Sequence, residues 1–236
     1  MKVSYTIADL IAFEDEIAEL FAEKRIHAPV HLAGGNEEQL IRIFEEHVNP
    51  DDWVLCSWRS HYHCLLKGVP PEQLRRAILD GKSISLCFPE YRILSSGIVG
   101  GTAPIAVGLA MGIWRKSEHL SFQDCSSMTK MAKVGRKVVC FLGDMTAETG
   151  IVHESIKYAV NFNLPVLFVI EDNELSGATC TPSVWGREAE LRSIGLRYPA
   201  VCEGFGPYQE GQKCKVLRYK YRLTRPHVGI GKHVVF

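Results

Sequence analysis

The chain has 236 residues, of which 46% are hydrophobic and 23% are charged, so it is long enough to bury the core of one ordinary globular domain. Lysine plus arginine and aspartate plus glutamate number 27 each. Without a basic excess, the chain does not fit the classes of protein that bind nucleic acid or anionic membranes through charge.

The cysteines and the N-terminal residues indicate a soluble protein of a cytosol-like compartment. The eight cysteines are scattered, without a Cys-x-x-Cys pair that would suggest a zinc ribbon or a redox pair, so most are expected to be reduced core thiols. Acidic residues interrupt the first apolar segment, unlike a signal peptide, and no later apolar run approaches the roughly 20 residues of a membrane span. We therefore expect a cytoplasmic protein that does not enter a membrane.

The N-terminal quarter of the chain predicts two helices and a strand. Apolar residues recur at helical spacing over residues 6–24, with acids between them, and again over residues 37–47. Residues 49–52 break this pattern. The apolar run of residues 53–56 then predicts a short buried strand.

Beyond this strand, we expect a loop that carries Trp58, Arg59 and His61. Two prolines then open a helix over residues 71–79. The glycine-rich residues 96–101 precede a helix of small residues from Ala103 to Trp114, whose alanines and glycines would allow a neighbour to pack closely. Residues 117–136 are polar and mixed, which predicts a surface connection.

The next segments predict a strand, a helix and a strand in succession. They cover residues 137–142, 150–161 and 166–170. Such a unit requires parallel strands buried under helices. The expected fold class is therefore α/β, with three layers (αβα) and a mainly parallel sheet.

After Gly186 the pattern weakens. Residues 216–221 alternate as in a strand, and residues 225–229 form a final loop. The sequence shows no internal repeat and no clean linker, so we expect residues 1–236 to form a single domain.

Polar residues follow both strands of the strand-helix-strand unit. Asp144 comes after the first strand and Asn173 after the second, so they should meet at the edge where open parallel sheets bind ligands. Carboxylate and amide oxygens, together with phosphate oxygens, suit Mg²⁺. The turn from Thr146 to Gly150 would add backbone N–H groups and a helix dipole for an anion. The alternative is that both residues are ordinary caps after strands.

The segment from Gly143 to Asn173 closely resembles the thiamine-diphosphate signature of alpha subunits of pyruvate, branched-chain and acetoin dehydrogenases. In that signature, Gly-Asp-Gly is followed one helix later by Asn-Asn. Gly150, His153, Glu154, Leu164 and Pro165 agree in register. Met145 replaces the second glycine and puts a Cβ where the family's backbone approaches the diphosphate, and Asp172 replaces the first asparagine. We expect a reshaped site that still works.

By this resemblance the cofactors are thiamine diphosphate and Mg²⁺, held in a thiamine-diphosphate-binding fold. The implied metal ligands are Asp144, Asn173 and the backbone carbonyl of Leu175. The implied cofactor contacts of this segment are Gly143, Asp144, Met145, Thr146, Asn173 and Leu175. Glu154, within the helix, is interpreted as an orienting or interface carboxylate rather than a base.

Two further segments resemble the same family. In the loop of residues 57–61, Arg59 would reach the diphosphate, since a guanidinium can bind phosphate oxygens bidentately, and Trp58 would be its aromatic neighbour. From Gly97 to Gly100, backbone groups would meet the aminopyrimidine and Val99 would wedge the cofactor into its bent shape. Without the resemblance, Arg59 could be a surface ion-pair partner and Val99 simple core.

Three histidines have two interpretations each. His61 and His63 lie two positions apart in the expected loop and could be a hydrogen-bonded structural pair. We favour His61 as a residue that lines the site and leave His63 undecided. His227 lies in a loop similar to the family's Tyr-Arg-x-x-Gly-His loop, with a spacing longer by one, and is either an active-site histidine or a loop residue.

The resemblance covers most of the chain, densely over residues 53–180 and thinly after 186. The region from about residue 187 is shortened compared with full-length relatives, and a Gly-Gly-Ser-Met-His motif is missing. The resemblance implies an alpha-type subunit that decarboxylates a 2-oxo acid and transfers its acyl group. Activity would require a beta-type subunit with the pyrimidine domain and an activating glutamate, in a heterotetramer of two alpha and two beta chains. Docking to a lipoyl-bearing partner stays open.

Two alternatives accompany this function. The first is a split carboligase of the transketolase or acyloin-forming type, which would grip the cofactor in the same way. The second, from another class, is a non-catalytic scaffold subunit that keeps the fold while Met145 blocks the site.

Overall fold

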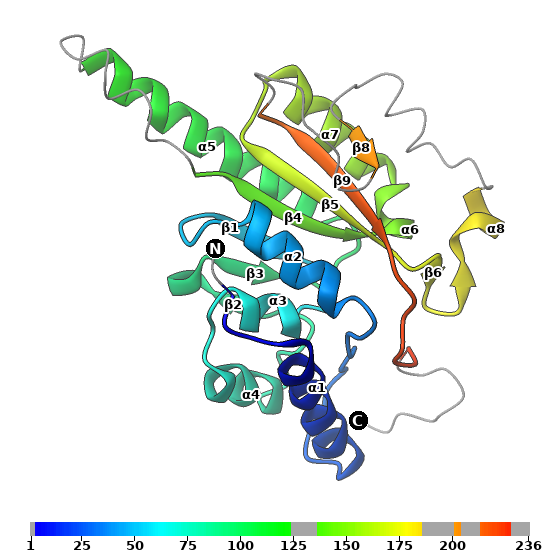
Figure 1. Ribbon diagram of the computed structural model, residues 1–236. Helices are drawn as coiled ribbons and strands as arrows, with labels where there is room; N and C mark the ends of the chain where they lie inside the picture. Colours follow the sequence, from blue (N-terminus) through cyan, green and yellow to red (C-terminus); the bar gives the residue numbers. More distant parts are fainter. Residues whose placement is uncertain (1–2, 124–135, 186–200, 204–212, 228–236) are drawn as a thin grey trace.

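The computed structural model describes residues 3–123, 136–185, 201–203 and 213–227. The strands are β1 (Trp53–Cys56), β2 (Cys87–Phe88), β3 (Ile93–Ser95), β4 (Val138–Gly143), β5 (Val166–Asp172), β6 (Leu175–Ser176), β7 (Thr179–Cys180), β8 (Val201–Glu203) and β9 (Lys215–Lys220). Seven of them form one sheet in the order β2-β3-β1-β4-β5-β9-β8, and β6 pairs with β7 in a separate hairpin (Figure 1). Among the described strands of the large sheet, β2 and β3 pair antiparallel and the other neighbours pair parallel.

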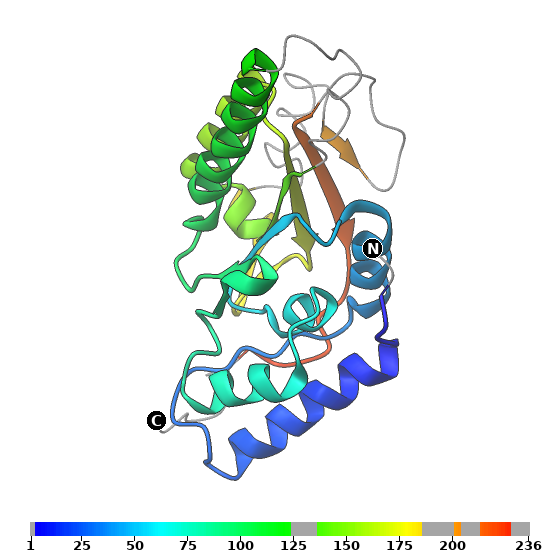
Figure 2. The same ribbon diagram turned by 90° about the vertical axis from the view of Figure 1, so that its left-hand side faces the viewer.

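Helices cover both faces of this sheet. They are α1 (Ile7–Ala22), α2 (Glu37–His47), α3 (His61–Leu66), α4 (Pro71–Leu79), α5 (Thr102–Gln123), α6 (Asp144–Ala147), α7 (Gly150–Asn161) and α8 (Thr181–Trp185), with a 3₁₀ turn, η1 (Pro89–Tyr91). Alternate strand residues divide between two cores: one joins the sheet to α1–α4 and the other joins it to α5 and α7. Figure 2 shows α5 (green) along one side of the sheet and α1 (blue) far from α5. The expected three-layer α/β architecture is confirmed.

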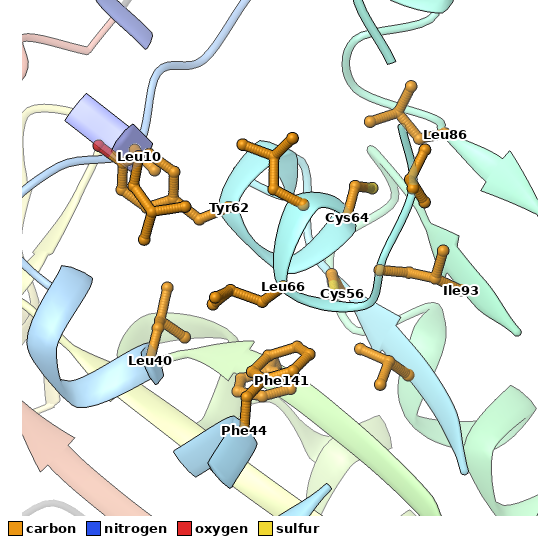
Figure 3. Close-up of a cluster of buried hydrophobic side chains, with 14 of the residues drawn as sticks. Leu10, Leu40, Phe44, Cys56, Tyr62, Cys64, Leu66, Leu86, Ile93 and Phe141 are labelled. Atoms are coloured by element: carbon orange, nitrogen blue, oxygen red, sulfur yellow. The ribbon is translucent and has the colours of Figure 1, made fainter. Parts of the chain in front are cut away.

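Helix α3 lies at the centre of the first core. All of its residues are buried, and Tyr62, Cys64 and Leu66 point into the cluster of apolar side chains around it (Figure 3). Phe44 of α2 stacks on Phe141 of β4 with ring centroids 5.9 Å apart, which joins the helical layer to the sheet. Helix α3 therefore packs in the same layer as α1 and α2, on one face of the sheet.

Local sequence features explain several element boundaries. At the start of α1, the Thr6 hydroxyl accepts a hydrogen bond from the backbone N–H of Asp9, and the Asp9 carboxylate accepts one from the backbone N–H of Thr6. Pro71 occupies the first turn of α4, where no intrahelical N–H is needed. The bounds expected for α2, β1, α4 and α7 agree with the structure.

Two expectations about local structure were wrong. His61 and His63, expected in a loop, lie on helix α3 (His61–Leu66), because the apolar side chains of this helix can be buried between α1, α2 and the sheet. Residues 117–123, expected in a surface connection, continue α5, since no glycine or proline ends the helix after Gly112. The rest of that connection, residues 124–135, lies outside the described residues. Strands β2, β3, β6, β7 and β8 and helix α8 were not predicted.

The described cysteines and helices bear on the earlier expectations about compartment and membrane. Cys56, Cys64, Cys140 and Cys214 are buried free thiols, whereas Cys87 and Cys180 are exposed free thiols. Within the described ranges, no helix combines the length and apolar character needed to cross a bilayer. That residues 1–236 form a single domain stays a prediction.

Candidate functional site

A pocket opens at the carboxyl ends of β1, β4 and β5, the edge at which open parallel sheets bind ligands. It is lined by Ala33, Asn36, Ser57, Trp58, Arg59, Gly143, Asp144, Met145, Thr146, Glu171, Asn173, Leu175, Ser176, Gly177 and Tyr221. The expected site residues Trp58, Arg59, Gly143, Asp144, Met145, Thr146, Asn173 and Leu175 are therefore together. The expected residues His61, Gly97, Val99 and His227 are not in this lining.

Strand pairing brings Asp144 and Asn173 to the same edge. Gly143, the last residue of β4, pairs in register with Glu171 of β5, so Asp144 and Asn173 follow at neighbouring strand ends. Asn173 Oδ1 accepts a hydrogen bond of 3.1 Å from the backbone N–H of Leu175, which shapes the turn into β6. The expected parallel pairing of these two strands is confirmed.

Asp144 is the buried carboxylate of the pocket. It is only 3% exposed, and its Oδ2 has no hydrogen-bond partner in the described residues. Burial raises the pKa of Asp144, the Thr181 hydroxyl opposes this rise, and the charge of Asp172 adds to it. A buried carboxylate oxygen without a partner is unfavourable unless a cation or donor meets it. The site therefore fits a bound cation.

Asn173 and Leu175 carry the other oxygen donors at this edge, and oxygen atoms are hard ligands. Within the described residues, no three His, Cys, Asp or Glu side chains converge on a cation position. A cation here would use the Asp144 carboxylate with amide and main-chain oxygens from Asn173 and Leu175, and would take its remaining ligands from an anion and water. That donor set suits Mg²⁺ better than zinc or copper.

Met145, which departs from the family signature, contacts a residue that the sequence analysis did not identify. Trp185 Nε1 of α8 donates to Met145 Sδ at 2.9 Å. The contact gives the side chain a partner outside the sheet, on α8.

The turn expected between Thr146 and Gly150 begins instead with helix α6, and only Thr146 of that segment lines the pocket. The expected contribution from the start of α7 is therefore not seen.

Asp172, the second departure from the family signature, pairs with an arginine of β9, a strand that is distant in the sequence. Arg218 of β9 donates to Asp172 Oδ2 from Nη2 at 2.6 Å and from Nε at 2.9 Å. Asp172 Oδ1 accepts the backbone N–H of Glu174 at 3.0 Å. The carboxylate is 1% exposed but satisfied, so the chain replaces the family's amide by a buried ion pair.

Arg59 meets two histidines at the mouth of the pocket. Its Nε donates to the backbone oxygen of Leu32 at 3.2 Å, and its Nη2 donates to His227 Nδ1 at 2.9 Å. His227 stacks on His31 with ring centroids 4.6 Å apart, and His31 lies 5.9 Å from the Trp58 ring. Because a guanidinium can only donate, His227 Nδ1 is the acceptor, which requires a neutral ring.

The electrostatics of this cluster favour neutral histidines. Burial and the charge of Arg59 lower the pKa of His227. Burial, followed by Arg59 and His227, lowers the pKa of His31 to about 4. The sequence analysis missed His31, although its place before the glycine pair at 34–35 could have drawn attention to it.

His61 lies in the core instead of the pocket. His61 Nε2 is 2.9 Å from Ser83 Oγ, its Nδ1 is 3.2 Å from Glu14 Oε1, and all three residues are 0% exposed. His63 faces another direction, with Nε2 3.3 Å from Glu171 Oε1. The two histidines do not form a pair, because residues two apart on a helix point away from each other. The expectation that His61 lines the site was wrong.

Glu171 lines the pocket and belongs to a buried polar network that sequence reasoning missed. Its Oε1 accepts a hydrogen bond of 2.7 Å from the Tyr219 hydroxyl and one of 3.3 Å from Asn36 Nδ2. Asn36 Nδ2 also donates to the Tyr219 hydroxyl oxygen at 3.0 Å. The network links β5, β9 and the start of α2.

The Gly97–Gly100 segment lies beside an apolar surface rather than in the pocket. Ile98 is 74% exposed and Val99 is 52% exposed. A Cβ at Gly100, which has φ +73°, would lie 2.7 Å from Ile151 Cγ2, so this segment packs closely on the start of α7. A groove lined by Pro104, Val107, Ile151, Glu154, Ser155 and Tyr158 continues this surface between α5 and α7. The location of Glu154 in the groove is compatible with an interface carboxylate.

Comparison with known proteins identifies similar sequences. The sequence model of the dehydrogenase E1 component family matches residues 5–190. The chain is 30% identical over 183 residues to the alpha subunit of acetoin:2,6-dichlorophenolindophenol oxidoreductase from Bacillus subtilis, which covers 72% of the chain and 49% of that relative. It is 27% identical over 190 residues to the chloroplastic pyruvate dehydrogenase E1 component subunit alpha-3 of Arabidopsis thaliana, covering 74% and 42%. The chain spans about half the length of these relatives.

Proposed function

Because the chain belongs to the dehydrogenase E1 component family, we propose that it is the cofactor-gripping, alpha-type subunit of a two-chain enzyme that decarboxylates a 2-oxo acid. The observation that carries this proposal is the Asp144 carboxylate, buried with an unpartnered oxygen at the carboxyl edge of β4 and β5. Its natural complement is a divalent cation that holds a diphosphate.

We propose thiamine diphosphate and Mg²⁺ as the cofactors. Asp144, Asn173 and the backbone carbonyl of Leu175 would hold the ion. When bound, thiamine diphosphate supplies the electron sink for decarboxylation of a 2-oxo acid. Gly143, Met145 and Thr146 would lie along the diphosphate, and Trp58 would flank it.

Arg59 would bind the diphosphate oxygens. Its Nε is held by the backbone oxygen of Leu32, so the guanidinium has less freedom to lose on binding. A neutral His227, which accepts from Arg59, can donate from Nε2 toward an anion at the mouth of the pocket. Arg59 would thus keep His227 in the tautomer that serves as a donor.

The exposed apolar residues around 98–99 support the need for a second chain. Ile98 and Val99 lie on a surface that continues into the groove between α5 and α7. Apolar side chains this exposed in one continuous area are typical of a protein interface. A beta-type subunit with the pyrimidine domain and activating glutamate would cover Val99 and complete the cofactor site, in an assembly of two alpha and two beta chains.

The test begins with the complex as it exists in cells. The tagged chain is purified from its native cells, its partners are identified by mass spectrometry, and bound thiamine diphosphate is measured. Release of carbon dioxide from a panel of 2-oxo acids would support decarboxylation, whereas ketol transfer between sugars would indicate a carboligase. A chain recovered alone and without cofactor would overturn the two-chain proposal.

The matched variants are Asp144→Ala and Glu38→Ala. Glu38 is an exposed acid on α2 that does not line the pocket, so its variant should keep the cofactor. Loss of cofactor only in the Asp144 variant would exclude a scaffold subunit with a blocked site. Equal retention in both would remove Asp144 from the proposed metal site.

A further inference from the structure

Helix α1 carries one charged residue on its buried face. Glu14 is 0% exposed, and Leu10 and Ile17 of the apolar core flank it on this face. Glu14 Oε2 has no hydrogen-bond partner in the described part of the chain. Burial of a carboxylate costs free energy that an apolar residue of similar size would not cost. The presence of Glu14 at this position therefore needs an explanation other than stability.

The second carboxylate oxygen of Glu14 joins two segments that are distant in the sequence. Glu14 Oε1 accepts the backbone N–H of Ala33 at 3.0 Å, and it lies 3.2 Å from His61 Nδ1. The contact with Ala33 is a hydrogen bond, whereas the contact with His61 is a close polar contact without hydrogen-bond geometry. On the other side of the imidazole ring, His61 Nε2 lies 2.9 Å from Ser83 Oγ. Glu14 thus ties the segment before α2 to the start of α3.

Arg59 lies between the same two segments. It precedes His61 by two residues, and its Nε donates to the backbone oxygen of Leu32 at 3.2 Å. The adjacent residues Leu32 and Ala33 therefore connect Arg59 to Glu14 on one side. The main chain from Arg59 to His61 connects them on the other side, so the contacts form a closed ring. Arg59 lines the pocket, and Glu14 closes the ring from outside the pocket lining.

We propose that Glu14 is a positioning residue for Arg59, and that it acts through the main chain at residues 32–33 and through the start of α3. This inference rests on the proposed function, because it takes Arg59 as a ligand of the cofactor diphosphate. Glu14 holds the Ala33 peptide group, and the neighbouring Leu32 oxygen then holds the guanidinium. A guanidinium held in this way loses less conformational freedom when it binds phosphate oxygens bidentately.

The first test compares Glu14→Leu with Glu14→Gln in the complex of the chain with its partner. Binding of thiamine diphosphate at saturating Mg²⁺ is measured by calorimetry. Leucine fills the space but cannot accept the Ala33 N–H, so binding should weaken about tenfold. Glutamine keeps a carbonyl oxygen for this N–H, so its variant should bind within about threefold of the parent. If Glu14 only filled space in the core, leucine would be tolerated at least as well as glutamine.

The second test repeats Glu14→Leu in an Arg59→Ala background. Arg59→Ala alone should weaken binding, and Glu14→Leu should then add less than about twofold, because the group that Glu14 positions is gone. A merely structural role would weaken binding by the same factor in both backgrounds. That result, or equal binding by the parent, Glu14→Leu and Glu14→Gln, would overturn the positioning role.

If Glu14→Leu does not fold, the His61 side of the ring decides the matter. His61→Asn places an amide nitrogen near the position of Nδ1, which faces Glu14, whereas His61→Gln places one near the position of Nε2, which faces Ser83. The Gln variant should bind thiamine diphosphate about threefold more weakly than the Asn variant, and the two should bind equally in the Arg59→Ala background. Equal binding by the two variants in the parent background would overturn the proposal.

Failure of the positioning role is distinguishable from failure of the proposed function. If the parent complex binds thiamine diphosphate with Mg²⁺, and Arg59→Ala weakens binding while Glu14→Leu does not, only the role of Glu14 is wrong. If the parent complex does not bind the cofactor at saturating Mg²⁺, the proposed function itself is wrong and the role of Glu14 falls with it.

Discussion

The edge of β4 and β5 and the loop at residues 97–101 carry two halves of the expected cofactor site, and they differ in how complete they are. At the strand edge, Asp144 is 3% exposed and the surrounding donors are in place. In the loop, Ile98 is 74% exposed and Val99 is 52% exposed. The comparison teaches that, under the proposed function, this chain would organise the cation and diphosphate end by itself and leave an apolar face for another chain to cover.

The largest expected effect on cofactor binding is at the carboxyl edge of β4 and β5. Asp144→Asn should weaken Mg²⁺-dependent binding of thiamine diphosphate more than about 100-fold, since the amide cannot neutralise the ion. The same change should raise the free energy of unfolding of the ligand-free chain by about 1 kcal/mol, because it removes a buried unpartnered carboxylate. Calorimetry and thermal melting measure the two effects. A variant that both binds and melts like the parent would show that Asp144 is not the cation ligand.

The next effect concerns the ion pair that replaces the family's amide. Arg218→Ala leaves Asp172 buried without its cation and should lower the free energy of unfolding by about 3 kcal/mol. Adding Asp172→Asn in the same chain should recover part of this loss, because the uncompensated charge is gone. Denaturant melts of the two variants check the prediction, and an unrelieved double variant would contradict the role given to the charge.

A smaller effect on cofactor binding is expected at Arg59. Arg59→Lys keeps the positive charge but loses the planar fork, so binding of the diphosphate should weaken about tenfold. Arg76→Lys, an exposed change on α4, is the control and should have no effect. Equal affinities for the three proteins would remove Arg59 from the diphosphate site.

The histidine cluster should make stability depend on pH. The folded-state pKa of His31 is about 4, below the ordinary value of 6.5, so between these values the unfolded chain takes up a proton that the folded chain refuses. Stability therefore falls as the pH decreases through this window, by about 1 kcal/mol for His31 at pH 5 after allowance for its partial exposure. His31→Gln should flatten the pH dependence of the melting temperature, whereas exposed His27→Gln should not.

The smallest expected effect on the stability of the chain is in the loop of residues 97–101. Val99→Ser should change the free energy of unfolding by less than about 0.5 kcal/mol, because the side chain is half exposed. It should nevertheless weaken association with the beta-type partner, measured by co-purification. Val184→Ser, at the same 52% exposure, is the matched control. If both variants keep the partner equally, the 97–101 loop is not part of the interface.

The strand-helix-strand unit explains how much of the site could be predicted from sequence. Parallel pairing of β4 and β5 fixes where each strand ends, so the positions of Asp144 and Asn173 followed from the strand pattern alone. His61 could not be placed in this way. It is the first residue of α3, a buried helix on which alternate residues face different neighbours, and this helix was not recognised.

Contacts between distant segments were the other part that sequence could not provide. The Asp172–Arg218 pair joins β5 to β9, and the Met145–Trp185 contact joins α6 to α8. No local pattern marks either pair, because each residue alone is an ordinary polar or apolar side chain. The strand at residues 216–221 was predicted, but its place beside β5 required the fold.

The location of β9 also affects the order in which the protein folds during synthesis. Strand β5 pairs with β4 on one side and with β9, residues 215–220, on the other. While the ribosome still holds the last part of the chain, β5 is an apolar edge strand, and such an edge can pair with another chain. The network of Glu171, Tyr219 and Asn36 closes only when β9 arrives. A nascent chain therefore has a late-closing strand edge beside the pocket.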